Sequence, residues 1–203
     1  MSKRHYVGCM TLKDYDISQF KNPLFTVDSV LFTVVDNTLK VLVVKRANEP
    51  FMGCWGLPGG FVDVDNDDNT DMTAKRKLVE KTGLTPQYLE QLQVFSGINR
   101  DPRGFSVTSA YYALVAYQPV ETQIETVEQA RWVSLNELSL MAVAFDHKKI
   151  IDTALKRLQQ KALYSMVPVY CCPKEFTVGQ LKNVIETIID KDIQRKSLMR
   201  RIE

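Results

Sequence analysis

Hydrophobic residues recur in short runs along the first two-thirds of the chain, and turn-forming residues separate the runs. Runs rich in β-branched and aromatic residues are typical of strands. The strands predicted in this way cover residues 25–35, 40–45, 89–98, 106–117 and 130–133. Asp36 and Asn37 stand between the first two, which predicts a hairpin that opens a sheet.

One helix is predicted between these strands, over residues 70–82. Ala74 and Leu78 lie on one side of it, whereas Met72 and Val79 lie on another. It ends at Gly83, a residue type that commonly terminates helices. A single helix placed between strands predicts an α+β fold with a mixed sheet, not a series of alternating βαβ units.

After the last predicted strand the hydrophobic spacing becomes helical. Residues 145–161 carry hydrophobic positions at a period near 3.6, which predicts a long amphipathic helix, and 167–170 is predicted to be extended. Thr177 and Gln180 have the spacing of a capping box at the start of a further helix. The domains expected from this change of pattern are 1–150 and 151–203.

The composition is that of an ordinary globular chain. Of 203 residues, 45% are hydrophobic and 25% are charged, and the formal net charge is +2, so any basic surface must be local. No hydrophobic run approaches the ~18 residues of a membrane span, and no apolar stretch follows the basic N-terminus as in a secretory signal. The four cysteines lack metal-binding spacing. We expect a cytoplasmic protein with no membrane partner.

A glycine-rich run followed by the predicted helix forms the clearest motif of the chain. The run Trp-Gly-Leu-Pro-Gly-Gly-Phe at 55–61 precedes a loop and then Arg76, Glu80, Gly83 and Leu84. This order resembles the Nudix box, and the resemblance covers the sheet-rich part of the chain. It implies a Nudix-like fold, in which glutamates of the helix hold Mg²⁺ or Mn²⁺ against a diphosphate.

Two lysines depart from that pattern. Lys77 and Lys81 stand where the family has glutamates, which leaves Glu80 from the helical carboxylates of the motif. Divalent cations prefer carboxylate oxygens, and neighbouring lysines repel them. We therefore expect no metal, no required cofactor, no catalytic residue and no efficient hydrolysis. Two alternatives stay open: the acidic loop 63–68 supplies replacement carboxylates, or Arg76 and Glu80 form only a surface ion pair.

A second motif joins two of the predicted strands. The segment Asn-Arg-Asp-Pro-Arg-Gly-Phe resembles a segment of Nudix proteins that act on or bind ADP-ribose. Arg100 and Arg103 offer guanidinium groups for phosphates, Phe105 offers a ring for a base, and Arg46 ends a strand directed toward the same cleft. With Glu80, these are the expected ligand-binding residues, and ADP-ribose is the expected effector. The alternative is a Pro-Gly turn with solvated charges.

The C-terminal stretch has the size and spacing of a helix-turn-helix. Its second helix, predicted over 193–202, is basic, and its hydrophobic residues can face inward while polar ones remain free for phosphates and base edges. The expected DNA-binding residues are Thr177, Gln180, Arg195, Lys196, Ser197, Arg200 and Arg201. The alternative is a helical hairpin with a solvated basic face.

Three further segments extend the resemblance over most of the chain. Phe-Asp-His at 145–147, Phe-Thr at 176–177 and Met-Arg-Arg-Ile at 199–202 resemble the Nudix-related transcriptional regulators of NAD metabolism, the NrtR family. The resemblance implies a winged helix-turn-helix after the Nudix-like domain, operator DNA as partner, and a homodimer. The chain leaves no room for the wing, so we expect a truncated DNA-binding domain. His147 is expected to be a packing or capping residue.

Three functional hypotheses follow from these observations. The leading one is an ADP-ribose-responsive transcriptional repressor of NAD-metabolism genes that binds its ligand without turnover. The second is a Mg²⁺-dependent ADP-ribose or sugar-nucleotide pyrophosphatase with an unusual Nudix box, whose activity Glu80→Gln would abolish. The third is an inert interaction module that binds neither nucleotide nor DNA.

Overall fold

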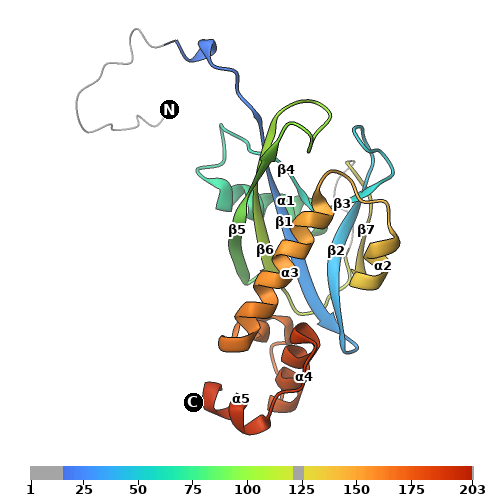
Figure 1. Ribbon diagram of the computed structural model, residues 1–203, viewed down its shortest axis with the longest axis vertical. Coiled ribbons are helices and arrows are strands. Elements are labelled where there is room, and N and C mark those ends of the chain that lie inside the picture. The colour runs from blue at the N-terminus through green and yellow to red at the C-terminus, as the bar shows by residue number, and fades with distance from the viewer. Residues whose placement is uncertain (1–15, 121–125, 203) are drawn as a thin grey trace, which may run out of the picture.

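A seven-stranded mixed sheet forms the centre of the computed structural model, which describes residues 16–120 and 126–202 (Figure 1). Its strands are β1 (Leu24–Val35), β2 (Thr38–Arg46), β3 (Trp55–Gly56), β4 (Gly59–Phe61), β5 (Tyr88–Gly97), β6 (Ser106–Leu114) and β7 (Val127–Ser134). The five strands predicted from hydrophobic runs are confirmed as β1, β2, β5, β6 and β7. The remaining two, β3 and β4, are too short to produce a periodic pattern.

The sheet is built around β1, the longest strand. The strand order is β3-β2-β1-β6-β5, with β4 paired to β1 and β7 to β2. β1 runs parallel to β6, and the other pairs are antiparallel. Asp36 and Asn37 have φ angles of 50° and 53°, the left-handed conformation of a tight two-residue hairpin turn. The predicted hairpin is therefore confirmed.

Helices cover the sheet and continue beyond it. They are α1 (Thr70–Thr82), α2 (Leu135–Leu140), α3 (His147–Tyr164), α4 (Val178–Ile189) and α5 (Arg195–Ile202), with short 3₁₀ helices η2 (Ile17–Gln19) and η3 (Val167–Cys171). None of those in 16–120 and 126–202 is long and apolar enough to cross a membrane.

The ends of the helices show which local predictions succeed. The side chain of Asn69 accepts from Met72 N at the start of α1, and Gly83 at φ 70° ends it, so the predicted bounds are confirmed. The extended segment predicted at 167–170 is wrong, because these residues form η3 with Pro168 in its first turn. The short helix α2, which begins with its own capping box, was not predicted.

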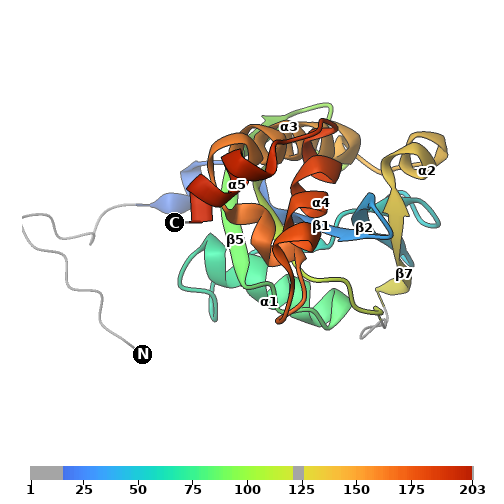
Figure 2. The same cartoon turned by 90° about the horizontal axis from the view of Figure 1, so that it is seen from below.

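The sheet is buried on both faces, which α1 and α3 cover from opposite sides (Figure 2). Successive residues of β1 point to opposite faces, as strand geometry requires. Leu31 packs with Leu42 and with Leu78 of α1, whereas Val30 and Phe32 belong to the cluster on the side of α3. The α+β fold with a mixed sheet is thus confirmed.

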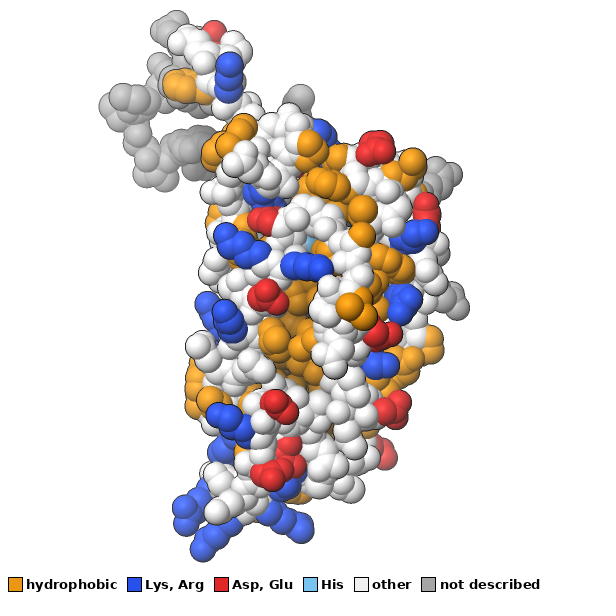
Figure 3. All heavy atoms as spheres, turned by 45° about the vertical axis from the view of Figure 1, so that its right-hand side comes forward, with side chains coloured by type: hydrophobic (Ala, Val, Ile, Leu, Met, Phe, Trp, Pro, Cys, Tyr) orange, Lys and Arg blue, Asp and Glu red, His pale blue; other side chains and the backbone are white. Residues whose placement is uncertain are grey.

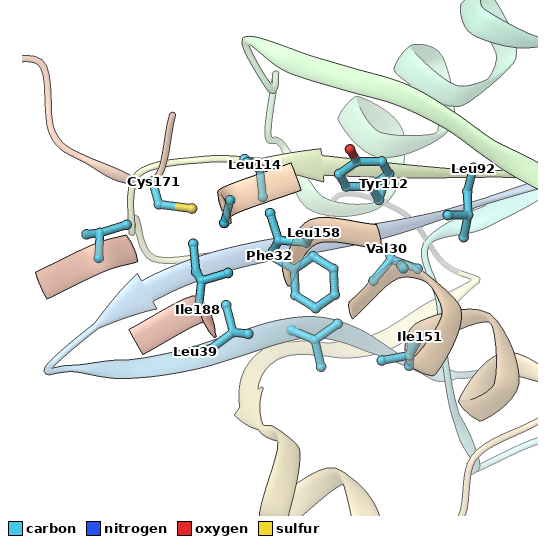
Figure 4. Close-up of a cluster of buried hydrophobic side chains, with 14 of the residues drawn as sticks. Val30, Phe32, Leu39, Leu92, Tyr112, Leu114, Ile151, Leu158, Cys171 and Ile188 are labelled. Atoms are coloured by element: carbon cyan, nitrogen blue, oxygen red, sulfur yellow. The ribbon is translucent and has the colours of Figure 1, made fainter. Parts of the chain in front are cut away.

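The C-terminal helices pack into the same hydrophobic core as the sheet (Figure 4). Ile188 of α4 and Leu198 of α5 are buried in one cluster with Phe32 of β1 and Leu158 of α3. The expected boundary between residues 150 and 151 falls inside α3. The long helix α3 therefore both covers the sheet and supports the C-terminal helices.

The cysteines of the described residues are free thiols. Cys171 and Cys172 are buried, and burial raises their pKa values to about 12 and about 11. Both thiols are therefore protonated at neutral pH and act as small hydrophobic side chains. Cys54 is partly exposed, and Cys9 lies outside the described residues.

Candidate functional site

A cleft of about 190 Å³ lies where β1, β4 and the end of β2 meet the start of α3. Charged and titratable side chains of both signs line it: Asp28, Arg46, Lys81, Arg100, Asp101, Arg103 and His147. The rest of its lining consists of Thr26, Val44, Asn48, Leu57, Gly59, Gly60, Phe61, Thr126 and Phe145. The site therefore joins the middle of the sheet to a segment more than a hundred residues later in the sequence.

Close contact between β4 and β1 forms one wall of the cleft. Gly59 pairs with Asp28, and a Cβ atom at Gly59 would overlap Asp28 Oδ1 and Val27 O. Only glycine allows the two backbones to approach in this way. The Pro-Gly-Gly part of the motif thus has a structural role, since it places a buried carboxylate beside the cleft.

The first residue of α3 forms the floor of the cleft. Leu57 N donates to His147 Nδ1 at 2.9 Å, and His147 Nε2 lies 3.7 Å from Asp28 Oδ1. Burial lowers the pKa of His147, although Asp28 and Asp146 act in the opposite direction. The imidazole is therefore neutral at pH 7, with its proton on Nε2 because Nδ1 accepts a hydrogen bond. The burial of His147 agrees with the expected packing role, and its Nε2 faces Asp28 at more than hydrogen-bond distance.

Arg100 connects the loop between β5 and β6 to the start of α3. Its side chain is 7% exposed, and its Nη2 lies 2.9 Å from Asp146 Oδ1 and 3.9 Å from Asp28 Oδ2. A third contact runs from Nη1 to Ser106 Oγ at 3.0 Å. Asp146 is the N-cap residue of α3. An anion that enters the cleft can reach Arg100 only by competing with this carboxylate.

The other two expected arginines line the same cleft. Arg103 is paired with Asp101 at 2.7 Å and lies 5.3 Å from the centre of the Phe61 ring. Arg46 donates from Nε to the carbonyl oxygen of Pro50 at 2.8 Å and lies 5.0 Å from the Phe145 ring centre. The structure thus brings together three arginines from β2 and the loop after β5, as the motif analysis predicts.

Two further expected ligand residues lie apart from this lining. Phe105 is 51% exposed, and neither it nor Glu80 is among the residues that line the cleft. Glu80 accepts from Arg76 at 2.9 Å and from Lys77 at 3.0 Å. Burial raises the pKa of Glu80, but the two cations outweigh that effect and hold it below its usual value. Arg76 and Glu80 thus form the (i, i+4) ion pair of the alternative interpretation, and a ligand role of Glu80 stays a prediction.

The acidic loop does not assemble a metal site. Asp67 accepts from Arg76 at 2.5 and 2.8 Å, and this guanidinium holds the pKa of the Asp67 carboxyl well below its usual range. Asp63 accepts from Asn66 and from backbone of its own loop. In 16–120 and 126–202, no three carboxylate, histidine or cysteine side chains converge on one point. The residues present do not fit the Mg²⁺ or Mn²⁺ that the Nudix box implies.

The C-terminal helices present a basic surface at one end of the molecule, where lysine and arginine side chains gather (Figure 3). Thr177 and Gln180 form the capping box at the start of α4, as predicted. The expected DNA-contacting residues that are exposed on α5 are Arg195, Lys196, Ser197 and Arg200. Arg201 requires a correction. Its Nη2 donates to the carbonyl oxygens of Ala162 and Ser165 at 2.8 and 2.5 Å, which holds the side chain against the end of α3.

Sequence reasoning missed several residues of the cleft. Asp28 is a lone carboxylate within a hydrophobic strand, a signal that could have identified it, since buried carboxylates require partners. Phe145, at φ 54°, and Asp146 precede the first helical residue of α3. Nothing in the local pattern predicts that Phe145 lines the cleft or that Asp146 pairs with Arg100. Lys81 lines the cleft, although the motif analysis treated it only as the loss of a carboxylate.

Comparison with protein families and curated proteins gives three matches. The NUDIX domain family model matches residues 25–154. The "ADPR responsive transcriptional repressor NtrR" of Acinetobacter baylyi is 39% identical over 191 residues, which are 94% of this chain and 76% of that protein. An ADP-ribose pyrophosphatase of Methanocaldococcus jannaschii is 32% identical over 148 residues, which are 71% of this chain and 82% of that protein.

Among solved structures, the chain is similar to NrtR of Shewanella oneidensis. The two are 48% identical with a TM-score of 0.82, over 88% of this chain and 84% of that one. The same relative complexed with a 27mer DNA superposes with a TM-score of 0.81, over 88% of this chain and 82% of that one. Its NUDIX domain complexed with ADP ribose superposes with a TM-score of 0.70, over 72% of this chain and 96% of that one.

The buried imidazole leads to a prediction about stability in acid. The folded-state pKa of His147 lies below the ~6.5 of an unfolded chain, so below that pH the unfolded state binds the proton more readily. We expect the free energy of unfolding to fall by up to about 1 kcal/mol per pH unit below about pH 6.5. The variant His147→Asn keeps an acceptor near the position of Nδ1 but does not titrate. We expect it to lose this pH-dependent part of the free energy of unfolding. Urea unfolding at several pH values measures the free energy of unfolding of both proteins. Parallel pH profiles of the wild type and His147→Asn would contradict the prediction.

Proposed function

The chain belongs to the NUDIX domain family, and we propose that it is an ADP-ribose-responsive transcriptional repressor of NAD-metabolism genes. The observation that carries the proposal is the likeness to the NtrR repressor, which extends over 94% of the chain, whereas the likeness to the pyrophosphatase extends over 71%. A repressor needs both a ligand cleft and a DNA-binding segment. The chain has a charged cleft at one end and a basic helix at the other.

The cleft supports ADP-ribose as the ligand. A diphosphate requires cationic donors, and Arg46, Arg100, Arg103 and Lys81 line one cavity. Adenine and ribose require aromatic and polar contacts, which Phe61, on the rim, and its neighbours offer. We retain Glu80 and Phe105 as second-rank candidates, because both lie outside the lining of the cleft. Of the five expected ligand residues, the three arginines carry the proposal.

The same residues favour binding without turnover. Hydrolysis in this fold family uses a metal held by carboxylates of the box helix, where Glu80 is occupied by Arg76 and Lys77. The acidic loop is engaged within itself and with Arg76. Among the described residues, no other group of carboxylate, histidine or cysteine side chains is placed to hold a metal ion. The pyrophosphatase hypothesis therefore has the likeness to the archaeal enzyme in its favour but lacks a metal site.

DNA binding is assigned to α5 and the start of α4. Arg195, Lys196, Ser197 and Arg200 are exposed on one short helix, which suits contacts to phosphates and base edges. Arg201 is excluded from this set because it holds the end of α3. We propose that a homodimer presents two such helices at the half-site spacing of about 34–36 Å.

We propose that α3 couples the two sites. Its first turn contributes His147 to the cleft and follows Asp146, the partner of Arg100. Its last turn accepts hydrogen bonds from Arg201 of α5. An 18-residue helix spans about 27 Å. A phosphate that binds Arg100 in place of Asp146 releases the start of this helix. We expect this release to change the populations of the orientations that α5 adopts.

The first experiment is a calorimetric titration of ADP-ribose in EDTA and in excess Mg²⁺, followed by chromatography of the cell contents. We expect saturable binding in both conditions and recovery of intact ADP-ribose, because no described carboxylate cluster can hold a metal. Release of AMP and ribose phosphate that is abolished by Glu80→Gln would instead establish the pyrophosphatase. Absence of binding would remove ADP-ribose as the ligand and leave only the C-terminal helices to explain.

The assignment of α5 predicts a change in salt dependence. We expect Arg195→Ala with Arg200→Ala to weaken binding to a duplex of the 27mer bound by the Shewanella relative. Each lost phosphate contact should reduce the slope of log K against log salt by about 1 per protomer. The control is Lys21→Ala with Lys75→Ala, which removes the same charge from exposed positions outside the C-terminal helices. Fluorescence anisotropy over a salt series measures both, and equal slopes for the two double variants would refute the assignment.

The coupling through α3 predicts that Asp146→Asn separates ligand binding from the DNA response. Without the competing carboxylate, Arg100 is free for phosphate, so ADP-ribose should bind several-fold more tightly. The ratio of DNA affinities with and without ADP-ribose should move toward one, since the start of α3 is already released. Asp152→Asn, exposed on the same helix, is the matched control. An unchanged ratio in Asp146→Asn would contradict the coupling.

A further inference from the structure

Lys81 differs from the other cationic side chains of the cleft. Arg100 is paired with Asp146, Arg103 is paired with Asp101, and Arg46 donates to a backbone carbonyl. Lys81 lines the cleft, is half-buried, and has no hydrogen bond or ion pair with any residue in 16–120 and 126–202. A half-buried ammonium without a partner is costly, because it gives up part of its hydration without compensation. Its position therefore suits contact with an anion bound in the cleft.

The spacing along α1 explains why Lys81 remains unpaired. Lys77 lies one turn before it, and residues four apart share a helix face. Lys77 is directed to Glu80, its Nζ lying 3.0 Å from Oε2, and a Cβ atom at Gly60 would lie 3.2 Å from its Cε. Arg76 occupies the other oxygen of Glu80. The one carboxylate near Lys81 on this helix is thus already bound by two cations.

The surroundings of Lys81 are positively charged. Burial lowers its pKa, and the nearby Lys77 and Arg46 lower it further. Asp28 and Glu80 act in the opposite direction but do not compensate for these effects. A bound dianion would reverse the imbalance, because it supplies the negative charge that the ammonium lacks.

We propose that the Lys81 ammonium replaces the divalent cation in this cleft and donates directly to the diphosphate of the ligand. This inference rests on the proposed function and names one residue and one consequence of it. A glutamate at this position reaches a diphosphate only through a metal ion, whereas an ammonium is a compact cation with three donors of its own. Ligand binding is therefore independent of Mg²⁺, and the ligand keeps its charge neutralisation while no metal-bound water is present to attack it.

The test compares two variants of the same helix in the full chain. Lys81→Gln removes the charge in the cleft, and Lys75→Gln removes the same charge from an exposed position six residues earlier. We titrate each with ADP-ribose in EDTA and in excess Mg²⁺. Wild-type affinity should be equal in both conditions. Lys81→Gln should bind about ten- to a hundredfold more weakly, the range for a lost charge-assisted hydrogen bond, while Lys75→Gln stays within about twofold of wild type.

Two further variants make the result decisive. Lys81→Arg keeps the charge and should retain most of the affinity, which separates loss of charge from loss of folding. Lys81→Glu should lose binding in EDTA and regain part of it with Mg²⁺, since a carboxylate then needs the metal. Equal affinities of Lys81→Gln and Lys75→Gln, or a wild type that requires Mg²⁺, would overturn this inference and leave the proposed function standing. Absence of wild-type binding in both conditions would overturn both.

Discussion

The first turn of α3 is the constraint on which the cleft and the core both depend. His147 accepts from the backbone of Leu57, beside the glycine-rich motif, and faces Asp28 in the middle of the sheet. The same turn follows Asp146, which holds Arg100. A neutral imidazole, the buried carboxylate of Asp28 and the guanidinium of Arg100 thus lie together, and Asp146 pairs with the guanidinium from a partly exposed position. The helix that begins here continues into the hydrophobic cluster that includes α4 and α5.

The charges on α1 differ from the carboxylate pattern of the Nudix box. Lys77 and Arg76 bind the remaining carboxylate of the motif, and Lys81, which has no ion-pair partner among the described residues, lines the cleft. Replacement of two glutamates by lysines does more than remove metal ligands, because it reverses the sign of the field where a phosphate would lie. If the cleft binds ADP-ribose without turnover, as we propose, both properties would have this one physical origin.

Much of the fold followed from local patterns, and much of the site did not. The bounds of α1 were predictable because its cap, Asn69, and its terminator, Gly83, are neighbours in sequence. The arginines of the cleft were found because a motif contains them. Asp28 was not identified from the sequence, and His147 was assigned only a packing or capping role, since a contact such as that between Leu57 and His147 spans 90 residues and has no local signature. The 3₁₀ helix η3 was expected to be extended because of the β-branched Val167 and Val169. Its conformation depends on packing against the core, which propensity does not describe.

The shared core also limits how the two ends of the molecule can move. Close-packed interiors do not deform continuously, so a displacement of α3 requires that the helices packed on it settle in another discrete arrangement. Leu158 and Ala162 of α3 contact the cluster that contains Leu198, and Arg201 binds the last turn of the same helix. Lys196 and Arg200, each two residues from Leu198, lie on the opposite face of α5 and are exposed. Their orientation is therefore set by the position of α3, whose other end forms the floor of the cleft.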